Sequence, residues 1–303
     1  VPLLTACAPL LPREADPPAG TYRLATDLRY QLSRRDFLLH VPPDYRPGLP
    51  LVVVLHGAFS TGAQTEQETG FSRLADAANF VVAYPEGIGL FGYLQHWNAG
   101  HCCGRAAAEG VGDVDFIAEV IDQVADRLTI DRQRVYLVGM SNGGMLAYRF
   151  AAERSERLAA VAVVAGAMGS ASGAQPSWQL PQPGGPLPLL IVHGMADEAI
   201  PWAGGLSPKK KSGRGFVPGA TAAEFWRRHN HCAETPAVME AIPGSLQRLS
   251  WEGCQGGSVV EVDLLQGWGH RWPGRHFIDR LPPGDPLHEY DGTRRIWDFF
   301  NHF

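Results

Sequence analysis

The strongest constraint on the fold is an alternation of short apolar runs with longer segments of helical periodicity. The apolar runs cover 49–57, 80–87, 134–139, 158–166, 187–194 and 259–267. Continuous apolar runs are typical of parallel strands that are covered on both faces. The segment 34–42 alternates like a strand, and 113–128 and 293–303 show helical spacing. The pattern predicts an α/β fold with a mostly parallel central sheet and helices on both faces.

Composition and charge narrow the class of protein. The chain has 303 residues, of which 45% are hydrophobic and 19% are charged. A formal net charge of −5 without a strong basic field argues against nucleic acid as a partner. No apolar run reaches the roughly eighteen residues of a membrane-spanning helix. With no internal repeat or change of composition, we expect one folded domain over 21–303.

Residues 1–20 have the character of an export tail followed by a tether. The stretch "LTAC" at 4–7 resembles a bacterial lipobox, in which small residues precede a cysteine that is acylated after cleavage. The stretch 8–20 is rich in proline and suits a tether. The alternative is a chance cysteine in a disordered leader. We expect an exported bacterial protein that is periplasmic, secreted, or anchored to a membrane by a lipid on Cys7.

One predicted strand runs into a glycine-rich turn that carries a serine. Gly139, Ser141 and Gly143 form a G-x-S-x-G pattern between the strand 134–139 and an apolar helical segment. A nucleophile elbow needs small residues on both sides of its serine, because the turn is tight and its backbone is strained. The N-terminus of the next helix then points at the position of an oxyanion. Alone, the pattern fits a nucleophile or merely a small residue in a corner.

Two later strands supply the partners that such a serine needs. Asp197 follows the strand 187–194, and His270 lies in a glycine-flanked loop after 259–267. A serine nucleophile requires a base that is oriented by an acid, and the order Ser, Asp, His is typical of α/β-hydrolases. Asp197 could instead cap a helix, with Glu198 as the rival acid, and His270 could be structural. The shared placement after strands favours a catalytic triad of Ser141, Asp197 and His270.

The oxyanion hole is expected to use two backbone N–H groups. One belongs to Asn142, directly after the proposed nucleophile. The other comes from the loop after the strand 49–57, where His56 and Gly57 end the strand and Ala58 or Phe59 would donate. We assign the donor to Ala58. The alternative is that His-Gly is only a turn at the end of a strand.

Aromatic residues near these loops are candidates for binding substrate. Trp97, Trp202 and Trp272 each lie in a motif next to a predicted site loop, and His56 and Phe59 lie beside the expected oxyanion hole. Such side chains could line an acyl or sugar cleft. The tryptophans could equally be anchors of the core.

The five cysteines suggest disulfides. If Cys7 is lipidated, an even number remains, as expected for an exported protein. Cys232 and Cys254 lie in loop-like stretches and are the pair that we favour, whereas the adjacent Cys102 and Cys103 either bridge or stay reduced. The clusters "HCC" and "HNHC" could bind a metal, but neither has a C-x-x-C pair or a matching second half. We therefore expect no metal site.

The motifs together resemble those of the polyhydroxybutyrate depolymerase and LpqC-like esterases, which are related to feruloyl and acetylxylan esterases. The matching pieces are "LVVVLHG" at 51–57, "YPEG" at 84–87, "WNAGHCCG" at 97–104, "GDVDF" at 112–116, "DRQRVYLVGMSNGGMLAYRF" at 131–150, "HGMADEAIPWAGG" at 193–205 and "GWGHRWPG" at 267–274. The resemblance implies an α/β-hydrolase catalytic domain with Ser141, Asp197 and His270 as its triad and no metal or organic cofactor.

The chain departs from this family in three places. "GDVDF" lacks the usual paired acids before its valine, and Asp113 and Asp115 could still have structural roles. The region 271–292 is longer than expected before the last helix and is a candidate lid or rim. The loop 204–215 is basic and glycine-rich, and a solvated loop is favoured over a contact with an anionic substrate.

The expected activity is that of a serine carboxylesterase on a small or polymeric ester. We favour aromatic or short acyl esters of plant polysaccharide, of the feruloyl or acetylxylan type. The alternative is depolymerisation of polyhydroxybutyrate or hydroxyalkanoate oligomers. Two further alternatives, ranked after it, are a serine peptidase and a lipoprotein that binds ligands without turnover. The acyl group and the oligomeric state stay open, because the sequence does not fix the shape of the pocket.

Overall fold

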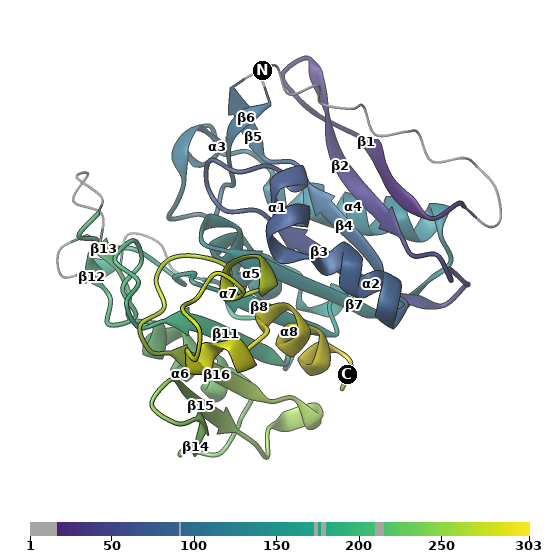
Figure 1. Cartoon of the computed structure of the whole chain (residues 1–303). Helices are drawn as coiled ribbons and strands as arrows, with labels where there is room; N and C mark the ends of the chain where they lie inside the picture. Colours follow the sequence, from purple (N-terminus) through teal and green to yellow (C-terminus); the bar gives the residue numbers. More distant parts are fainter. Residues whose placement is uncertain (1–16, 91, 173–174, 177–179, 210–214) are drawn as a thin grey trace.

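In a computed structural model of the chain, ten strands form one central sheet. The structure describes residues 17–90, 92–172, 175–176, 180–209 and 215–303, so Cys7 and its flanking residues lie outside it. The strands of the sheet are Gly20–Tyr30 (β1), Ser33–Val41 (β2), Leu49–Leu55 (β3), Val81–Pro85 (β4), Ile130–Met140 (β7), Ala160–Val164 (β8), Leu189–Gly194 (β11), Ala237–Ile242 (β14), Leu246–Trp251 (β15) and Val260–Leu265 (β16). Their order is β1-β2-β4-β3-β7-β8-β11-β16-β15-β14 (Figure 1).

The middle of the sheet is parallel and its two edges are antiparallel. Strands β4, β3, β7, β8, β11 and β16 run in the same direction. Strands β1 and β2 extend one edge, and β15 and β14 extend the other, all with antiparallel pairing. Every continuous apolar run in the sequence forms one of the six parallel strands, so the prediction of a mostly parallel sheet is confirmed.

Helices cover both faces of the sheet. They are Gly62–Thr69 (α1), Phe71–Ala78 (α2), Gly104–Ala108 (α3), Asp113–Arg127 (α4), Asn142–Glu153 (α5), Gly219–His229 (α6), Arg275–Ile278 (α7) and Gly292–Phe300 (α8). Short pieces complete the described chain: strands Ile88–Leu90 (β5), Tyr93–His96 (β6), Ala171–Ser172 (β9), Gln175–Pro176 (β10), Gly205–Leu206 (β12) and Gly215–Phe216 (β13), and 3₁₀ turns Ser155–Arg157 (η1), Gln255–Gly257 (η2) and Pro286–Glu289 (η3).

The period of two along the strands divides the core into two layers. In β3, Leu51, Val53 and Leu55 belong to the core on the side of α4, α5 and α6, whereas Val52 and Val54 belong to the core on the side of α2 and α8. All five side chains are fully buried. This explains why the sequence of β3 is continuously apolar and does not alternate.

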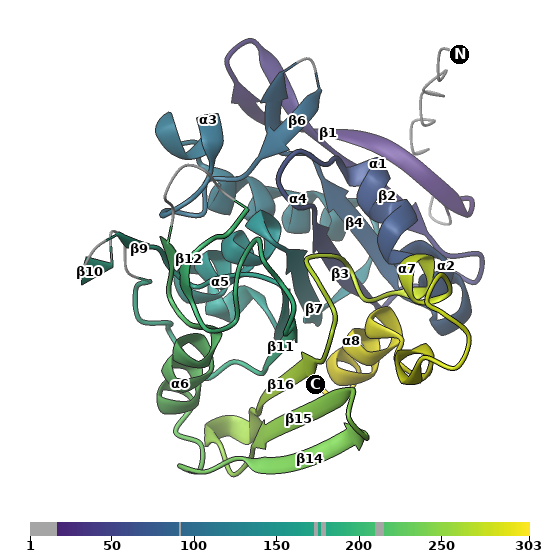
Figure 2. The ribbon, with the colours of Figure 1, turned by 60° about the vertical axis from the view of Figure 1, so that its left-hand side comes forward.

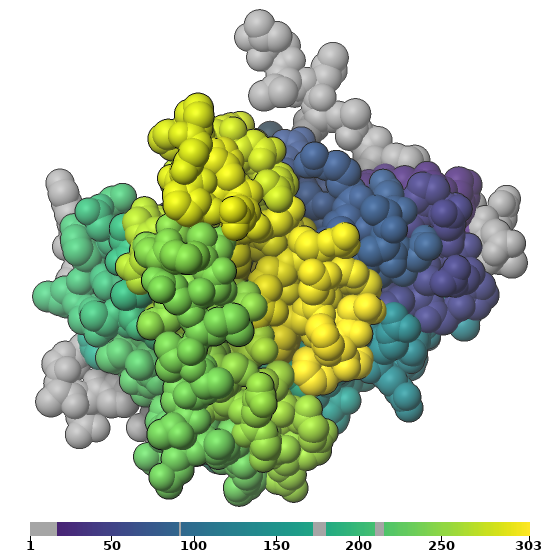
Figure 3. Space-filling model, turned by 60° about the horizontal axis from the view of Figure 1, so that its bottom comes forward, coloured from purple at the N-terminus to yellow at the C-terminus, as the bar shows by residue number. Residues whose placement is uncertain are grey.

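The last helix packs against an early helix in the second core layer. Helix α8, near the C-terminus, packs beside α2, and in Figure 3 the yellow C-terminal segment lies against the blue segment that contains α2. The ring of Trp297 stacks on Phe80 with a centroid distance of 4.0 Å. Strand β2 is joined to α4 by a buried ion pair between Arg35 and Asp113, with Nη2 and Oδ1 2.8 Å apart. Segments that are distant in the sequence are therefore joined within the core.

The carboxyl ends of the parallel strands lie at one edge of the sheet and carry the loops that matter for function. The loops after β3, β7, β11 and β16 contain Ala58, Ser141, Asp197 and His270. In open α/β sheets, ligands bind at this edge. The fold therefore brings together residues that are up to 212 positions apart, as 270 − 58 shows.

Candidate active site

Ser141 lies at the tip of the turn between β7 and α5. Its backbone angles are φ 56° and ψ −118°, a strained conformation for a residue with a side chain. A Cβ on Gly139 would overlap the backbone of Gly143, and a Cβ on Gly143 would lie 2.5 Å from the His56 carbonyl oxygen. Only glycine fits at both positions, which is why the turn has the G-x-S-x-G pattern.

The three residues predicted to form a triad lie in one hydrogen-bonded chain. His270 Nε2 is 2.9 Å from Ser141 Oγ, and His270 Nδ1 is 2.6 Å from Asp197 Oδ2. With Nδ1–H donating to the carboxylate, Nε2 is free to accept the serine proton. The structure thus brings Ser141, His270 and Asp197 together in the order that general-base activation requires.

Asp197 is held as a buried carboxylate. Its Oδ1 accepts the N–H groups of Ala199 at 2.8 Å and Ile200 at 2.9 Å, leaving Oδ2 for His270. Burial alone would raise the pKa of Asp197, but the hydrogen bond and charge of His270 and the Ile200 N–H outweigh it and lower the pKa. The neighbouring Glu198 is exposed and pairs with Lys209, so the rival acid does not face the site.

A second histidine stands behind this carboxylate, and the sequence alone did not single it out. His193 Nε2 donates to the Ile200 carbonyl oxygen at 2.9 Å and lies 3.7 Å from Asp197 Oδ2. Burial lowers the pKa of His193. His193 therefore stays neutral and fixes the loop that carries the acid.

The structure separates the two candidates for the first oxyanion donor. The Phe59 N–H donates to the Gln95 carbonyl oxygen at 2.8 Å, so it is already engaged. In the part of the chain that is described, the Ala58 N–H has no such acceptor. Asn142 is the first residue of α5, where backbone N–H groups have no partner within the helix. The pair Ala58 and Asn142 therefore fits the oxyanion hole better than the pair Phe59 and Asn142.

Asn142 also ties this turn to a neighbouring loop. Its side-chain Oδ1 accepts the Trp97 N–H at 2.7 Å, and its Nδ2 donates to the Trp97 carbonyl oxygen at 3.1 Å. The Trp97 indole Nε1 donates to the His56 carbonyl oxygen at 2.9 Å. Trp97 is fully buried and does not line the cavity at Ser141, so our prediction that it binds substrate is corrected to a role in the core.

The other predicted binding residues are also divided between core and cavity. Trp202 packs against Gly219 and the His193 ring, and it does not line the cavity at Ser141. Trp272 does line that cavity, although it is almost fully buried and its Nε1 donates to Thr293 Oγ1 at 2.9 Å. Phe59 lines the same cavity with 64% of its surface exposed.

His56 contributes to the cavity from a buried position. Its Nε2 accepts the Gly87 N–H at 3.0 Å, so Nδ1–H donates to the Gly57 carbonyl oxygen at 2.8 Å. Burial lowers its pKa to about 4, so the ring is neutral at physiological pH. His56 therefore positions the loop that carries Ala58 and is not a second base.

The cavity beside Ser141 has a volume of about 290 Å³. Strand ends and loops form one side, with Leu55, Ala58, Phe59, Met140, His270 and Trp272. Helix α1 and the turn before it form the other, with Ser60, Gln64, Thr65, Glu68 and Thr69. The residues of α1 were missed in the sequence. Their position just after the His-Gly turn was the available signal, because the segment following that strand faces the same edge.

The region 271–292 forms part of the rim. Helix α7 packs beside α1 (Figure 2), and Trp272 lines the cavity.

Asp113 and Asp115 have structural partners: Asp113 pairs with Arg35 and accepts the Asn98 N–H, and Asp115 pairs with Arg154. Burial raises the pKa of Asp113, while the charge of Arg35 opposes this.

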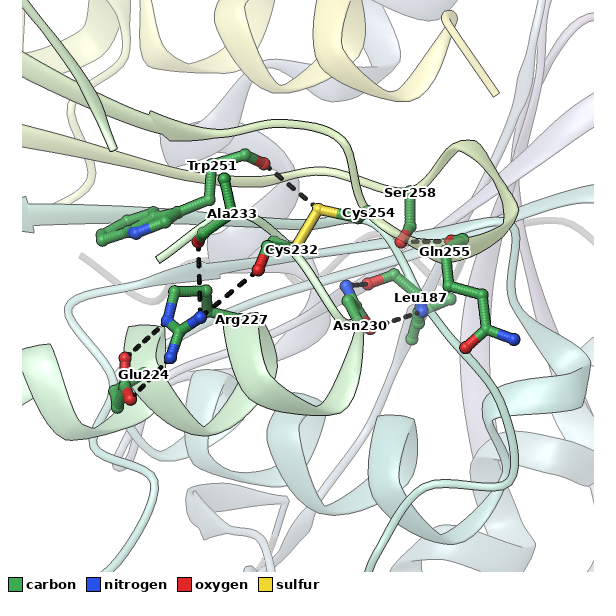
Figure 4. Close-up of a disulfide and its surroundings, with 10 residues drawn as sticks. All are labelled: Leu187, Glu224, Arg227, Asn230, Cys232, Ala233, Trp251, Cys254, Gln255 and Ser258. Carbon is green, nitrogen blue, oxygen red and sulfur yellow. Dashed lines mark hydrogen bonds and ion pairs between the residues drawn. A yellow bond between two sulfur atoms is a disulfide. The ribbon is translucent and has the colours of Figure 1, made fainter. Parts of the chain in front are cut away.

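The four cysteines in the described part of the chain are paired. Cys232, after α6, and Cys254, after β15, are joined by a disulfide (Figure 4). Arg227 lies beside it, pairing with Glu224 and donating to the Cys232 carbonyl oxygen at 3.3 Å. The structure also pairs Cys102 with Cys103. Among the described residues, no group of three or more His, Cys, Asp or Glu side chains is arranged to hold a metal ion.

Comparison with known proteins places the chain among esterases. The family model "Esterase PHB depolymerase" matches residues 36–180. The protein named "Putative esterase NocK" from Nocardia uniformis subsp. tsuyamanensis is 30% identical, over 91% of this chain and 81% of that protein. "Probable feruloyl esterase C" of Aspergillus oryzae is also 30% identical, over 89% and 85%. The chain spans only 32% of a 27%-identical "Bifunctional acetylxylan esterase/xylanase XynS20E" from Neocallimastix patriciarum.

Solved structures share the fold at low sequence identity. An acetyl xylan esterase from Aspergillus awamori superposes with a TM-score of 0.61 at 17% identity, over 86% of this chain and 97% of that one. A ferulic acid esterase from Anaeromyces mucronatus gives 0.53 at 14%, over 84% and 85%. The α/β-hydrolase fold expected from the sequence is confirmed. No helix in the described segments is both long and apolar enough to cross a membrane. The chain belongs to the PHB depolymerase family of esterases, which are carboxylic ester hydrolases.

Proposed function

We propose that the protein is a serine carboxylesterase that acts through a covalent acyl-enzyme. The observation that carries the proposal is the unbroken hydrogen-bonded chain from Ser141 through His270 to Asp197. It is set in a cavity at the carboxyl edge of the parallel sheet, where this family of folds binds ligands.

The first half of the reaction forms the acyl-enzyme. His270 Nε2 removes the proton of Ser141 as Oγ attacks the ester carbonyl carbon. The Ala58 and Asn142 N–H groups stabilise the oxyanion of the tetrahedral intermediate, and Asp197 stabilises the charged form of His270. The bond to the alcohol oxygen then breaks, and His270 gives its proton to the departing alcohol.

The second half releases the acid. A water molecule attacks the acyl carbon while His270 takes one of its protons. The new tetrahedral intermediate collapses, the bond to Ser141 Oγ breaks, and His270 returns the proton to the serine. Each of the three residues ends in the state in which it began.

The proposed substrates are aromatic or short acyl esters of plant polysaccharide. Relatives named feruloyl esterases and an acetylxylan esterase/xylanase support this class. A second class is polyester, because a relative from Paucimonas lemoignei is named "Poly(3-hydroxyalkanoate) depolymerase C". Rates on methyl ferulate, acetylated xylan and hydroxybutyrate oligomers separate these classes, and we expect the first two to be hydrolysed faster.

Replacing Ser141 with alanine tests the proposed chemistry. The Ser141→Ala variant should hydrolyse 4-nitrophenyl acetate at least about a thousandfold more slowly than the wild type, because no acyl-enzyme can form. Circular dichroism should be unchanged, since Ser141 contributes little to the core. Full activity in a folded Ser141→Ala variant would refute the proposal.

We also propose that the protein is exported and is lipidated at Cys7. The disulfide between Cys232 and Cys254 supports an oxidising compartment. Mass spectrometry of the mature protein from a bacterial host should find diacylglycerol on Cys7. A mature chain that begins elsewhere, or that carries a free Cys7 thiol, would contradict lipidation.

A further inference from the structure

The cavity around Ser141 has two walls of different chemistry. One wall is apolar and contains Leu55, Phe59, Met140 and Trp272. The other is formed by one face of α1 and the turn before it, and it contains Ser60, Gln64, Thr65, Glu68 and Thr69. A bound ester therefore meets both apolar side chains and hydrogen-bonding groups.

Most polar groups of this second wall already have partners in the protein. Spacings of four residues place Gln64 with Glu68, and Thr65 with Thr69, on one side of α1. The Thr69 hydroxyl donates to the Thr65 carbonyl oxygen at 2.7 Å. The Ser60 hydroxyl donates to Gln64 Oε1 at 3.3 Å. Their hydrogen-bonding capacity is thus partly used within the helix and its turn.

Glu68 differs from these residues. Among the described residues, no hydrogen bond or ion pair engages its carboxylate, although it is half-buried. Glu66, two positions earlier, accepts the hydroxyls of Thr21 and Ser72 at 2.7 Å each and does not line the cavity. Burial raises the pKa of Glu68, and the nearby His276 opposes this. Glu68 is therefore a carboxylate that faces the site with its acceptor capacity unused.

Glu68 also stands where the cavity meets a larger one. A second hollow of about 730 Å³ lies between α2, α8 and β15, and Glu68 and Thr69 line both. Its lining is rich in charged groups of both signs, such as Arg73 and Glu289. A substrate that extends from Ser141 past Glu68 would enter polar surroundings. Such surroundings suit a hydroxyl-rich chain better than an aliphatic polyester.

We propose that Glu68 is a specificity-determining residue that selects uncharged, hydroxyl-bearing esters. Its carboxylate accepts a hydrogen bond from a substrate hydroxyl, as in a saccharide ester, and it repels a carboxylate on the substrate. The proposal rests on the proposed function, because it names the substrate class of the same site. Saccharide esters are then favoured over hydroxyalkanoate oligomers that end in a carboxylate.

Three feruloyl esters with the same acyl group test the two parts of this proposal. Methyl ferulate has no hydroxyl on its alcohol part, feruloyl arabinose adds hydroxyls, and feruloyl quinate adds hydroxyls and a carboxylate. Glu68→Gln removes the charge and keeps an acceptor, whereas Glu68→Leu removes both. Glu66→Gln is the matched control, because it removes a charge from the same helix at a position that does not face the cavity.

The expected results are changes in ratios of kcat/KM. Glu68→Gln should raise the value for feruloyl quinate about tenfold relative to feruloyl arabinose. Glu68→Leu should lower the value for feruloyl arabinose about tenfold relative to methyl ferulate. Glu66→Gln should leave both ratios at the wild-type value. Ratios that move less than twofold in both Glu68 variants, or that move equally in Glu66→Gln, would overturn the proposal.

The wild-type protein provides a test that does not depend on how the variants fold. Raising the NaCl concentration from about 20 mM to about 500 mM should weaken its preference for feruloyl arabinose over feruloyl quinate, because salt screens the repulsion. A preference that is insensitive to salt would count against a charge effect. If Ser141→Ala stays active, the proposed function itself fails, whereas an inactive Ser141→Ala with unchanged ratios refutes only the role of Glu68.

Discussion

At the scale of single residues, the site depends on how Asp197 is held. Two backbone N–H groups, from Ala199 and Ile200, fix one carboxylate oxygen, and the other faces His270 Nδ1. The carboxylate thereby selects the histidine tautomer in which Nε2 can accept a proton. In the proposed mechanism, Asp197 positions the base and stabilises its charged form without touching the substrate.

Replacing Asp197 with asparagine should separate orientation from folding. The Asp197→Asn side chain is of equal size, but its amide cannot stabilise a charged His270, and kcat should fall about 10⁴-fold. The adjacent Glu198→Gln is the control, because Glu198 faces Lys209 and not the site. Steady-state kinetics on 4-nitrophenyl acetate gives both values. Equal losses in the two variants, or a loss of less than tenfold in Asp197→Asn, would contradict the assignment.

His56 should make the folded state sensitive to acid. Its pKa is about 4 in the folded protein, against an ordinary value of 6.5. Between these values the unfolded chain binds a proton that the folded chain does not, so the free energy of unfolding falls as the pH falls. The loss approaches about 3 kcal/mol at pH 4, and the term is absent above pH 6.5. Urea unfolding at a series of pH values measures this slope.

The His56→Gln variant isolates that contribution. The amide that replaces the imidazole does not titrate, so stability should depend less on pH between 6.5 and 4, even if the variant is less stable at pH 7. His193 is also buried with a lowered pKa and would retain its own share of the slope. An unchanged slope in His56→Gln would show that His56 is not the titrating group.

The triad residues could be predicted from the sequence, whereas the roles of two tryptophans could not. The order and strand context of Ser141, Asp197 and His270 were sufficient to predict that they meet. The roles of Trp97 and Trp202 were not predictable, because a tryptophan near a site loop has the same sequence signature in the core and in the cavity. Only the fold shows that Trp97 is fully buried and hydrogen-bonded to the His56 carbonyl oxygen.

At the scale of elements, the parallel strands were the most predictable part. Their apolar runs are long because helices cover both faces. Strands β14 and β15 were missed, since β14 is largely exposed and its sequence does not alternate between buried and exposed residues. Helix α7 was missed because it has only four residues. Short and exposed elements depend on tertiary contacts that periodicity does not report.

The disulfide links two of these elements. Cys232 and Cys254 close a loop of 22 residues between the end of α6 and the end of β15 (Figure 4). Loop closure of this length should stabilise the fold by about 3 kcal/mol. A Cys232→Ser/Cys254→Ser double variant should therefore unfold at lower urea concentration, while its kcat on 4-nitrophenyl acetate at room temperature stays at the wild-type value.

The reduced wild type is the control for that double variant. Adding a thiol reductant should lower the stability of the wild type more than that of the double variant, which retains only the pair of Cys102 with Cys103. If the double variant is as stable as the oxidised wild type, the bond contributes nothing to the fold. A loss of esterase activity in a folded double variant would instead indicate that the loop supports the site.

At the scale of the whole molecule, the candidate catalytic residues lie at one edge of the sheet, and the buried apolar side chains that stabilise the fold form two core layers. The layers join distant segments, as in the stacking of Phe80 on Trp297. The loops at the edge are then free to vary, which explains how relatives with different named substrates share this architecture. The sequence predicted the fold and the triad, whereas the cavity walls required the structure, because Glu68 and α1 carry no catalytic motif.

The most direct test of the central claim is to label the nucleophile. A fluorophosphonate probe reacts with an activated serine, and the wild type should gain the mass of one adduct, located on the peptide that contains Ser141. The Ser141→Ala variant should gain none, and Asp197→Asn should react much more slowly. An adduct on any other residue, or labelling of Ser141→Ala at the wild-type rate, would contradict the account of Ser141 as the nucleophile of this esterase.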